Sequence, residues 1–167
     1  MSELVRIDKI TQTKQGRMAL FCGEEFLFSV DTETYFSEHL TPGMSFTGEE
    51  LEQLWEKSQL RKAKDKALLY LSLRDYASGE LYDKLRQKFD ERACAAAVSA
   101  MSELGLINDL NFARHRAKYL MKQNKSRSQV RHHLSEKGLD RLTIEEVLEE
   151  LYQPEDDSSP ASYEKRP

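Results

Sequence analysis

Hydrophobic residues recur at helical spacing through most of the chain and alternate with polar residues only near its N-terminus. Three N-terminal segments, Leu4–Ile10, Arg17–Cys22 and Glu25–Val30, are short and rich in branched and aromatic residues, as β-strands are. Between them, Lys14-Gln15-Gly16 and Gly23-Glu24 have the composition of turns. The pattern predicts a small antiparallel sheet of roughly two or three strands, which has little core of its own.

The helical pattern begins after a connector, Thr34–Phe46. Thr47-Gly48-Glu49-Glu50 has the Thr-x-x-Glu form of a capping box. Three apolar residues share one face of the helix that it opens: Leu51, Leu54 and Trp55. The pattern continues through a charged stretch into Ala67–Arg74, which is apolar nearly all round. We expect that stretch to be buried.

Two shorter helices complete a first unit. Asp75–Gly79 breaks the pattern, and Ser78 is expected to begin the second helix. The apolar positions of this helix are Leu81, Leu85 and Phe89. Asp90 is expected to cap the third helix. The inward face of the third helix consists of Cys94, Ala97, Val98, Met101 and Leu104.

The segment from Glu103 to Arg114 joins this unit to the next one. Gly105 can take the left-handed conformation that ends a helix, and Asn108 or Asp109 can accept hydrogen bonds from the free amides of the following helix. The apolar side chains between them are expected to stay packed against the helices on either side. We therefore predict a structural joint of six residues: Gly105, Leu106, Ile107, Asn108, Asp109 and Phe112.

The same order of helices recurs after the joint. The apolar positions of the first helix are Phe112, Ala113, Ala117, Leu120 and Met121. Ser126-x-x-Gln129 is another capping box, which opens the second helix. Gly138 closes the second helix, and Asp140 or Thr143 opens the third. The inward positions of the third helix are Ile144, Val147, Leu148 and Leu151.

Corresponding positions of the two units keep a nearly constant spacing. Val130 and Leu134 lie 49 positions after Leu81 and Leu85. In the third helices, Leu148 lies 47 positions after Met101, and the same spacing separates Leu151 from Leu104. The repeat is therefore real but imperfect, because one loop is shorter by two residues.

These patterns predict a mainly α fold, α+β overall, in which tandem three-helix repeats follow a small antiparallel β element. Four regions are expected. They are a β-sheet region (1–46), a lead helix with the first repeat (47–105), the second repeat (106–152) and a disordered acidic tail (153–167).

The formal net charge of −4 hides one basic block. Residues 106–141 carry nine basic and three acidic side chains, whereas residues 142–167 carry two basic and eight acidic ones. Basic residues recur every four positions on two successive helices, with one more in the turn between them: Arg114, Lys118, Lys122, Lys125, Arg127 and Arg131. These six charges are expected to line one ridge that contacts phosphates or carboxylates. The alternative is an ordinary charged helix surface.

No motif for catalysis, a metal or a cofactor is present. The chain has no glycine-rich phosphate loop, nucleophile elbow or His-Glu-x-x-His pair. His132 and His133 are adjacent, which turns their side chains about 100° apart on a helix, so we expect them to be solvated or partly packed. The acidic pairs Glu145-Glu146 and Glu149-Glu150 are expected to form a solvated face. We infer a protein that is not an enzyme.

The remaining features favour a cytoplasmic location. The longest apolar run, Ala93–Val98, is far too short to span a bilayer, and the N-terminus lacks the central apolar block of a secretory signal. Cys22 and Cys94 lie in different parts of the chain and in no metal-ligand spacing, which fits a reducing compartment. We expect no membrane association.

Four motifs occur in order along the chain: Ala67-x-x-x-Leu71-x-x-Arg74, Ser78-x-Glu80-Leu81-x-x-Lys84-Leu85, Leu104-Gly105-Leu106-Ile107-Asn108-Asp109-x-x-Phe112-Ala113 and Val130-x-x-x-Leu134-x-x-Lys137-Gly138-Leu139. Together they resemble the RecX family of bacterial recombination regulators over about residues 60–150. The sheet-forming N-terminus resembles the extension that some members carry. Because several motifs agree in order, the resemblance is specific.

The resemblance implies a non-catalytic modulator that binds the RecA recombinase. We expect a monomer without cofactors. Proteins similar to RecX lodge in the groove of the RecA filament on single-stranded DNA and usually restrain its ATPase, strand-exchange and coprotease activities, with weak or indirect contact to the DNA. Carried over by position, the contact candidates are Arg74, Lys84, Arg114, Lys118, Arg127, Arg131 and Lys137, beside Lys122 and Lys125 of the ridge. The family usually has three helical units, whereas this sequence shows two, so weak, altered or lost regulation is also open.

Two other functions fit the basic block. Three-helix units with a basic second helix are similar to helix-turn-helix modules, which bind DNA directly. A helical-repeat adaptor for another acidic partner is the other alternative.

Overall fold

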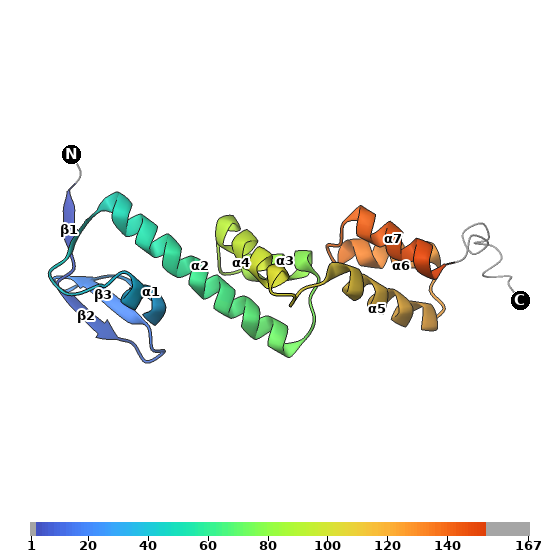
Figure 1. Ribbon diagram of the computed structural model, residues 1–167, viewed down its shortest axis with the longest axis horizontal. Coiled ribbons are helices and arrows are strands. Elements are labelled where there is room, and N and C mark those ends of the chain that lie inside the picture. Colours follow the sequence, from blue (N-terminus) through green and yellow to red (C-terminus); the bar gives the residue numbers. More distant parts are fainter. Residues whose placement is uncertain (1–2, 153–167) are drawn as a thin grey trace, which may run out of the picture. The chain divides into compact units, whose positions relative to one another are not determined.

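A computed structural model of the protein describes residues 3–152, so the predicted acidic tail lies outside the described residues. This part of the chain contains five short strands and seven helices, an α+β fold that is mainly helical (Figure 1). Its contacts define two compact units. The first unit takes the described residues up to Lys66 and Phe89–Ala97, and the second takes Ala67–Lys88 and the described residues from Val98 onward.

The N-terminal strands of the first unit form two small antiparallel sheets rather than one. β2 (Lys9–Gln12), β3 (Met18–Cys22) and β4 (Glu25–Val30) make a three-stranded sheet in that order, which confirms the predicted antiparallel element. β1 (Leu4–Arg6) instead pairs with β5 (Ser45–Thr47), with Val5 opposite Phe46.

The prediction of one continuous strand over Leu4–Ile10 is therefore wrong. Ile7 breaks it, because its N–H donates to Met44 O at 2.8 Å and its carbonyl accepts from Gly43 N at 2.7 Å. The Ile7 side chain is buried in the core of this unit. Backbone groups that bond to a distant loop are not available to a neighbouring strand, so the chain leaves one sheet and enters the other.

The segment 34–46 was also predicted incorrectly as a connector. It contains most of α1 (Thr32–Ser37) and the start of β5. Asp31 caps α1, since its Oδ2 accepts from Thr34 N at 3.0 Å. Asp31 also accepts a hydrogen bond from Ser58 Oγ at 3.2 Å, which attaches the long helix to this region of the unit.

Helix α2 (Gly48–Leu73) begins at the predicted capping box and runs without a break for 26 residues. Thr47 N donates to Glu50 Oε1 at 2.8 Å, and Glu50 N donates to Thr47 Oγ1 at 3.1 Å. Leu54 is buried as expected, whereas Trp55 is 38% exposed.

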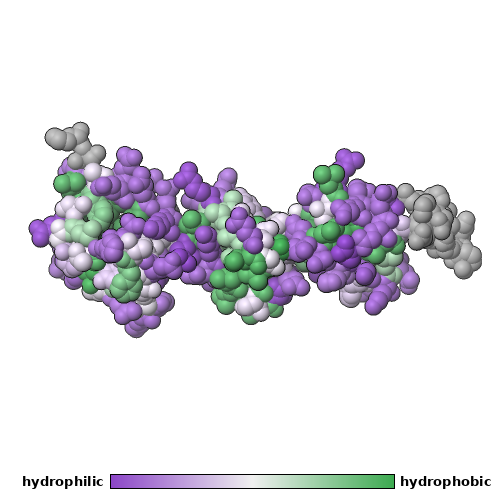
Figure 2. Space-filling model, in the orientation of Figure 1, coloured by the Kyte–Doolittle hydropathy of each residue, from purple (hydrophilic) through white to green (hydrophobic). Residues whose placement is uncertain are grey.

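The expectation that Ala67–Arg74 is buried is wrong. Ala67 is fully buried, but Leu68, Leu69 and Leu73 are 43%, 48% and 74% exposed. Figure 2 shows apolar surface along this C-terminal part of α2. An apolar segment is often buried, but its sequence does not show whether another element of the fold covers it.

The remaining helices of the repeats have the predicted order and caps. They are α3 (Ser78–Arg86), α4 (Glu91–Glu103), α5 (Asp109–Lys122), α6 (Arg127–Glu136) and α7 (Arg141–Leu151). The matched pairs of the repeat, Leu81 with Val130 and Leu85 with Leu134, are all fully buried. The equivalence that the spacing predicts is therefore confirmed at these positions.

Two predicted core positions near the end of α4 are wrong. Leu104 is 66% exposed and Leu106 is 47% exposed, whereas Ile107 is buried at 6%. Gly105 has the predicted left-handed conformation, with φ +78°, and Leu106 N donates to Met101 O at 2.9 Å. The turn is therefore stabilised by a backbone hydrogen bond and not by burial of Leu104 and Leu106. No helix in the described range is long and apolar enough to cross a bilayer.

Candidate functional site

The basic helices α5 and α6 are fixed at their starts by side-chain caps. Asn108 Oδ1 accepts from Asn111 N at 3.0 Å at the start of α5. At the start of α6, Ser126 and Gln129 form the predicted capping box, with hydrogen bonds of 2.9 and 3.2 Å. These local bonds set where each helix begins and therefore which basic residues share a face.

Three lysines of the predicted ridge are exposed. Lys118 and Lys122 lie one turn apart on α5, and Lys125 lies in the turn before α6. Within the described part of the chain, none of the three has an acidic partner within 4.0 Å. We call Lys118, Lys122 and Lys125 the lysine row.

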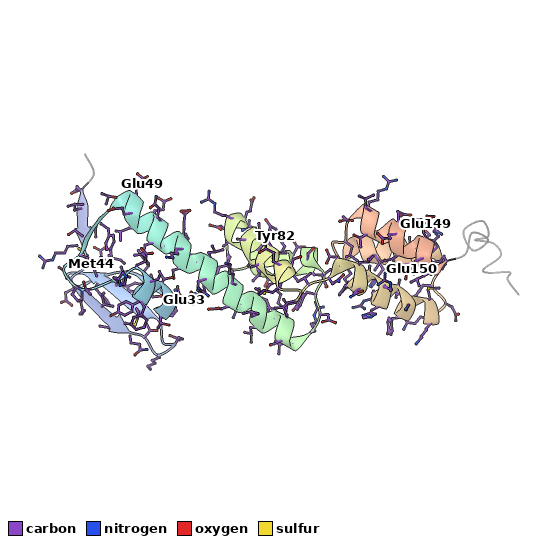
Figure 3. All side chains as sticks on the ribbon, in the orientation of Figure 1. Glu33, Met44, Glu49, Tyr82, Glu149 and Glu150 are labelled. Carbon is purple, nitrogen blue, oxygen red and sulfur yellow. The ribbon has the colours of Figure 1, made fainter. Side chains whose placement is uncertain are left out.

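Arg114, the first residue of the predicted ridge, is held by an acidic residue of α7. Its Nε and Nη2 donate to Glu150 Oε2 and Oε1 at 2.7 and 3.0 Å, a bidentate arrangement. Glu150 and its neighbour Glu149 are labelled in Figure 3. The hydrogen bonds from Arg114, with the charge of Lys118 in addition, lower the pKa of Glu150. Arg114 is therefore available to a partner only in exchange for Glu150.

Arg131 is held in the same way on another side of α7. Its Nε and Nη2 donate to Glu145 Oε2 and Oε1 at 2.7 and 3.2 Å, and this interaction lowers the pKa of Glu145. Glu145 and Glu150 are five residues apart, so they lie about 140° apart around the axis of α7. Arg114 and Arg131 consequently lie against different sides of α7 and do not form one row.

The expectation that these glutamates are merely solvated is corrected by the same contacts. Glu145 and Glu150 are half-exposed, and each also neutralises one arginine of the basic block. Arg127 is half-buried at the start of α6.

Two further contact candidates, Arg74 and Lys137, meet at one largely buried carboxylate, that of Glu80. Glu80, whose side chain is 14% exposed, lies 3.3 Å from Arg74 Nη2 and 3.1 Å from Lys137 Nζ. Burial, the largest single influence, would raise the pKa of Glu80, but hydrogen bonds from Arg74, the Ala77 amide and Lys137 lower it. This cluster therefore joins the start of α3 to the end of α6. Lys84, the remaining candidate, is exposed, with its Nζ 5.3 Å from the centre of the Tyr70 ring.

Two more contacts beside this cluster hold the repeats together. Asp109 accepts from Ser78 N at 2.7 Å and from Ser78 Oγ at 2.5 Å. Helix α3 begins at Ser78, as predicted, and its N-cap is Ala77. A Cβ on Gly79 would lie 2.7 Å from Gly138 O, so the two backbones touch.

The predicted joint is therefore only part of the contact between repeats. Asp109 contributes to it, whereas exposed Leu106 does not. The residues that sequence reasoning missed are Ser78, Gly79 and Glu80. A glycine in the first turn of α3 was the available signal, because glycine permits two backbones to approach closely.

A groove on α5 was also missed. It has a volume of about 370 Å³ and is lined by Arg74, Asp75, Phe112, His115, Arg116 and Tyr119. The sequence signal for this groove is the pair of aromatic residues Phe112 and Tyr119, which are seven positions apart and therefore share one face of the helix.

His133 lies close to the cluster around Glu80. Burial lowers its pKa, and the charges of Arg116 and Lys137 lower it further against the opposite influence of Glu136 and Glu80. Its neighbour His132 lies 3.4 Å from Glu136 and is exposed. Among the described residues no group of three histidine, cysteine or acidic side chains is placed to hold a metal ion.

The comparisons with known proteins agree with the repeat structure. Two family models match, described as the first and the second three-helix domain of RecX, over residues 63–99 and 108–148. These ranges contain the end of α2 with α3 and most of α4, and nearly all of α5 to α7.

Several similar proteins carry the name "Regulatory protein RecX". The one from Caldanaerobacter subterraneus subsp. tengcongensis is 31% identical over 144 residues, which is 86% of this chain and 73% of that relative. The one from Clostridioides difficile is 29% identical over 148 residues, 87% of this chain and 70% of the relative. For the protein of Listeria monocytogenes serotype 4a the identity is 32%, and the match spans 53% of that relative's length.

Two solved structures are also similar. A crystal structure of regulatory protein RecX has a TM-score of 0.66 at 22% identity and covers 96% of this chain and 79% of that chain, a likeness of fold. The crystal structure of RecX from Lactobacillus salivarius has a TM-score of 0.54 at 30% identity, over 59% of this chain and 64% of the other.

Proposed function

This chain belongs to the RecX family of regulatory proteins, and we propose that it binds the RecA recombinase filament on single-stranded DNA and restrains its ATPase, strand-exchange and coprotease activities. The observation that carries the proposal is the pair of matched three-helix domains. The protein acts by binding and catalyses no step of its own.

The lysine row is the part of the basic block that we propose as the main contact with the partner. Lys118, Lys122 and Lys125 are exposed and extend along α5 into the turn before α6. Cations in such a row attract phosphates or carboxylates, and the attraction weakens as salt rises. Lys84 is exposed and is a second contact of the same kind.

Two of the arginine candidates can bind the partner only after they release a glutamate of this chain. Arg114 and Arg131 reach a partner only when its phosphate or carboxylate replaces Glu150 or Glu145. Such an exchange keeps each guanidinium paired, so it favours a partner that presents anions in a fixed geometry. Arg127 lies in the same block, whereas Arg74 and Lys137 act mainly by holding Glu80 between the repeats.

Charge reversal in the lysine row tests the proposal. RecA filaments assembled on single-stranded DNA are sedimented with the wild-type chain and with a Lys118→Glu, Lys122→Glu double variant. We expect the wild type to co-sediment and the variant to stay largely in the supernatant, because two attractive charges become repulsive.

A second double variant, Lys14→Glu with Lys88→Glu, provides the control. Lys14 and Lys88 are exposed and lie outside the basic block, and the change in net charge is the same. If this control loses filament binding as completely as the lysine-row variant, the assignment of the lysine row is wrong. If the wild type does not sediment with the filaments, the proposed function itself is wrong.

A further inference from the structure

The groove on α5 combines exposed aromatic surface with positive charge. Phe112, His115, Arg116 and Tyr119 all come from α5, and Arg74 and Asp75 come from the segment between α2 and α3. All six residues lie in the second unit. The groove lies beside the lysine row on α5. Arg116 is turned about 160° away from Lys118 around the helix axis, whereas His115 is turned only about 20° from Lys122.

Tyr119 gives the groove a ring that a planar ligand can reach. The residue is 54% exposed, and its hydroxyl accepts a hydrogen bond from Gln123 Nε2 at 3.0 Å, which restricts the ring. Phe112 is partly buried against the core of the repeat, and the Arg116 guanidinium lies 5.8 Å from the centre of its ring. A bound planar group would therefore find one accessible aromatic face and one fixed cation close together.

Of the two arginines that line the groove, Arg74 is paired with Glu80, and only Arg116 lacks an acidic partner among the described residues. Arg74 is already engaged, with its guanidinium 3.7 Å from the centre of the Tyr76 ring and a hydrogen bond of 2.8 Å to Asp75 O. For Arg116, by contrast, the described residues offer no carboxylate within 4.0 Å. Asp75 is the one carboxylate in the lining.

We propose that this groove binds a nucleotide unit of a single-stranded nucleic acid, with the base stacked on Tyr119 and the adjacent phosphate held by Arg116. Aromatic rings that accept bases beside cations that accept phosphates are the means by which proteins bind single strands without sequence preference. A duplex does not fit, because its bases are stacked on one another and offer no free face. An acidic peptide would use the cations but has no need of the ring.

This inference goes beyond the proposed function, because it requires no recombinase. A fluorescently labelled oligo(dT) strand is titrated with the full chain in the absence of RecA, and its anisotropy is measured at low and at moderate salt. We expect Tyr119→Ala to weaken binding by about 5- to 150-fold, the range expected for the loss of one base–aromatic stack. Tyr119→Phe keeps the ring and is expected to bind like the wild type.

Arg116→Gln tests the phosphate contact, and Lys118→Gln is its matched control on the other face of α5. We expect Arg116→Gln to weaken binding and to reduce its salt dependence, while Lys118→Gln has a smaller effect on both. Equal losses for the two variants would overturn the proposal, because binding would then be a general effect of charge. A wild-type affinity for Tyr119→Ala would overturn it as well.

Competitors identify the ligand class. Unlabelled oligo(dT) is expected to displace the probe, whereas the matching duplex and a poly-glutamate peptide are not. Displacement by the peptide at equal charge would make the groove an acidic-peptide site and contradict the proposal. Thermal melting of each variant, followed by circular dichroism, shows that the compared proteins are folded. Failure of oligo(dT) binding would leave the sedimentation result with RecA unaffected, so the two proposals fail separately.

Discussion

The backbones of Gly79 and Gly138 touch, so Gly79 has no room for a β-carbon and a β-carbon on Gly138 would be crowded. A Cβ on Gly79 would lie 2.7 Å from Gly138 O and 2.9 Å from its Cα, and one on Gly138 would lie 3.0 Å from the Cα of Gly79. Gly79 belongs to α3 of the first repeat, and Gly138 lies in the turn just after α6 of the second. This contact therefore sets how closely these two helices approach.

Gly79→Ala is expected to destabilise the protein by about 1–3 kcal/mol, because the backbones must separate to admit the methyl group. Helix propensity alone would give the opposite sign, since alanine is favoured over glycine in a helix by roughly 1 kcal/mol. Urea unfolding followed by circular dichroism measures the change. An unchanged or increased unfolding free energy would show that the close contact does not constrain the fold.

Gly105→Ala is the control for this experiment. Gly105 has φ +78°, and nothing lies within 4 Å of a Cβ placed on it. We therefore expect only the conformational cost of a left-handed alanine, roughly 1 kcal/mol. The comparison separates crowding at Gly79 from backbone strain at the loop that was predicted to be the joint.

The stability of the second unit should fall as the pH decreases below about 6.5, because of His133. Its pKa is lowered in the folded protein by burial and by the charges of Arg116 and Lys137. The unfolded chain then binds a proton that the folded chain does not, so this group contributes stability above its ordinary pKa and loses it as the pH falls through that value. Unfolding free energies measured between pH 7.5 and 5.5 should show this slope.

Two histidine variants show which residue causes the pH dependence of the unfolding free energy. His133→Gln removes the titrating group and should flatten the dependence between pH 7.5 and 5.5. His132→Gln should leave it in place, because His132 is exposed next to Glu136. If the slope survives in His133→Gln and disappears in His132→Gln, the contribution of His133 is refuted.

Glu150→Gln should strengthen binding to a polyanionic surface. The carboxylate now pairs with Arg114 in a bidentate arrangement at 2.7 and 3.0 Å, and its loss releases the guanidinium next to Lys118. The pair is exposed, so we expect only a small change in unfolding free energy. Binding to RecA filaments, measured by sedimentation at several salt concentrations, should become tighter and more salt-dependent.

Glu149→Gln is the matched control, because Glu149 is the exposed neighbour of Glu150 on α7 and changes the net charge equally. An equal gain from both variants would show that only net charge matters. No gain from Glu150→Gln would show that Arg114 does not reach the partner.

Local signals in the sequence predicted the helix starts well. The capping boxes Thr47–Glu50 and Ser126–Gln129 and the caps Asp90, Asn108 and Asp140 are present in the structure. Each depends on residues three positions apart, so the pattern contains the whole interaction. The spacing of the repeat was equally accessible in the second helices, because their matched positions are buried alike. In the third helices Leu104 is 66% exposed, whereas its counterpart Leu151 is partly buried.

Interactions between distant residues could not be predicted in this way. The pairing of β1 with β5 brings Val5 opposite Phe46, and nothing local in either segment indicates the other. The prediction that six basic residues line one ridge failed for the same reason. Its spacing was visible, but the pairing of Arg114 with Glu150, 36 positions away, is a property of packing. The exposed leucines of α2 show that composition alone does not decide burial.

The rate of RecA-dependent ATP hydrolysis on single-stranded DNA tests the central claim most directly. RecA filaments are assembled, and hydrolysis is measured with increasing amounts of the wild-type chain and of the Lys118→Glu, Lys122→Glu variant. We predict that the wild type slows hydrolysis in a saturable way and that the variant needs a higher concentration for the same effect. An unchanged rate at a saturating concentration of the wild-type chain would contradict the claim that this protein regulates RecA.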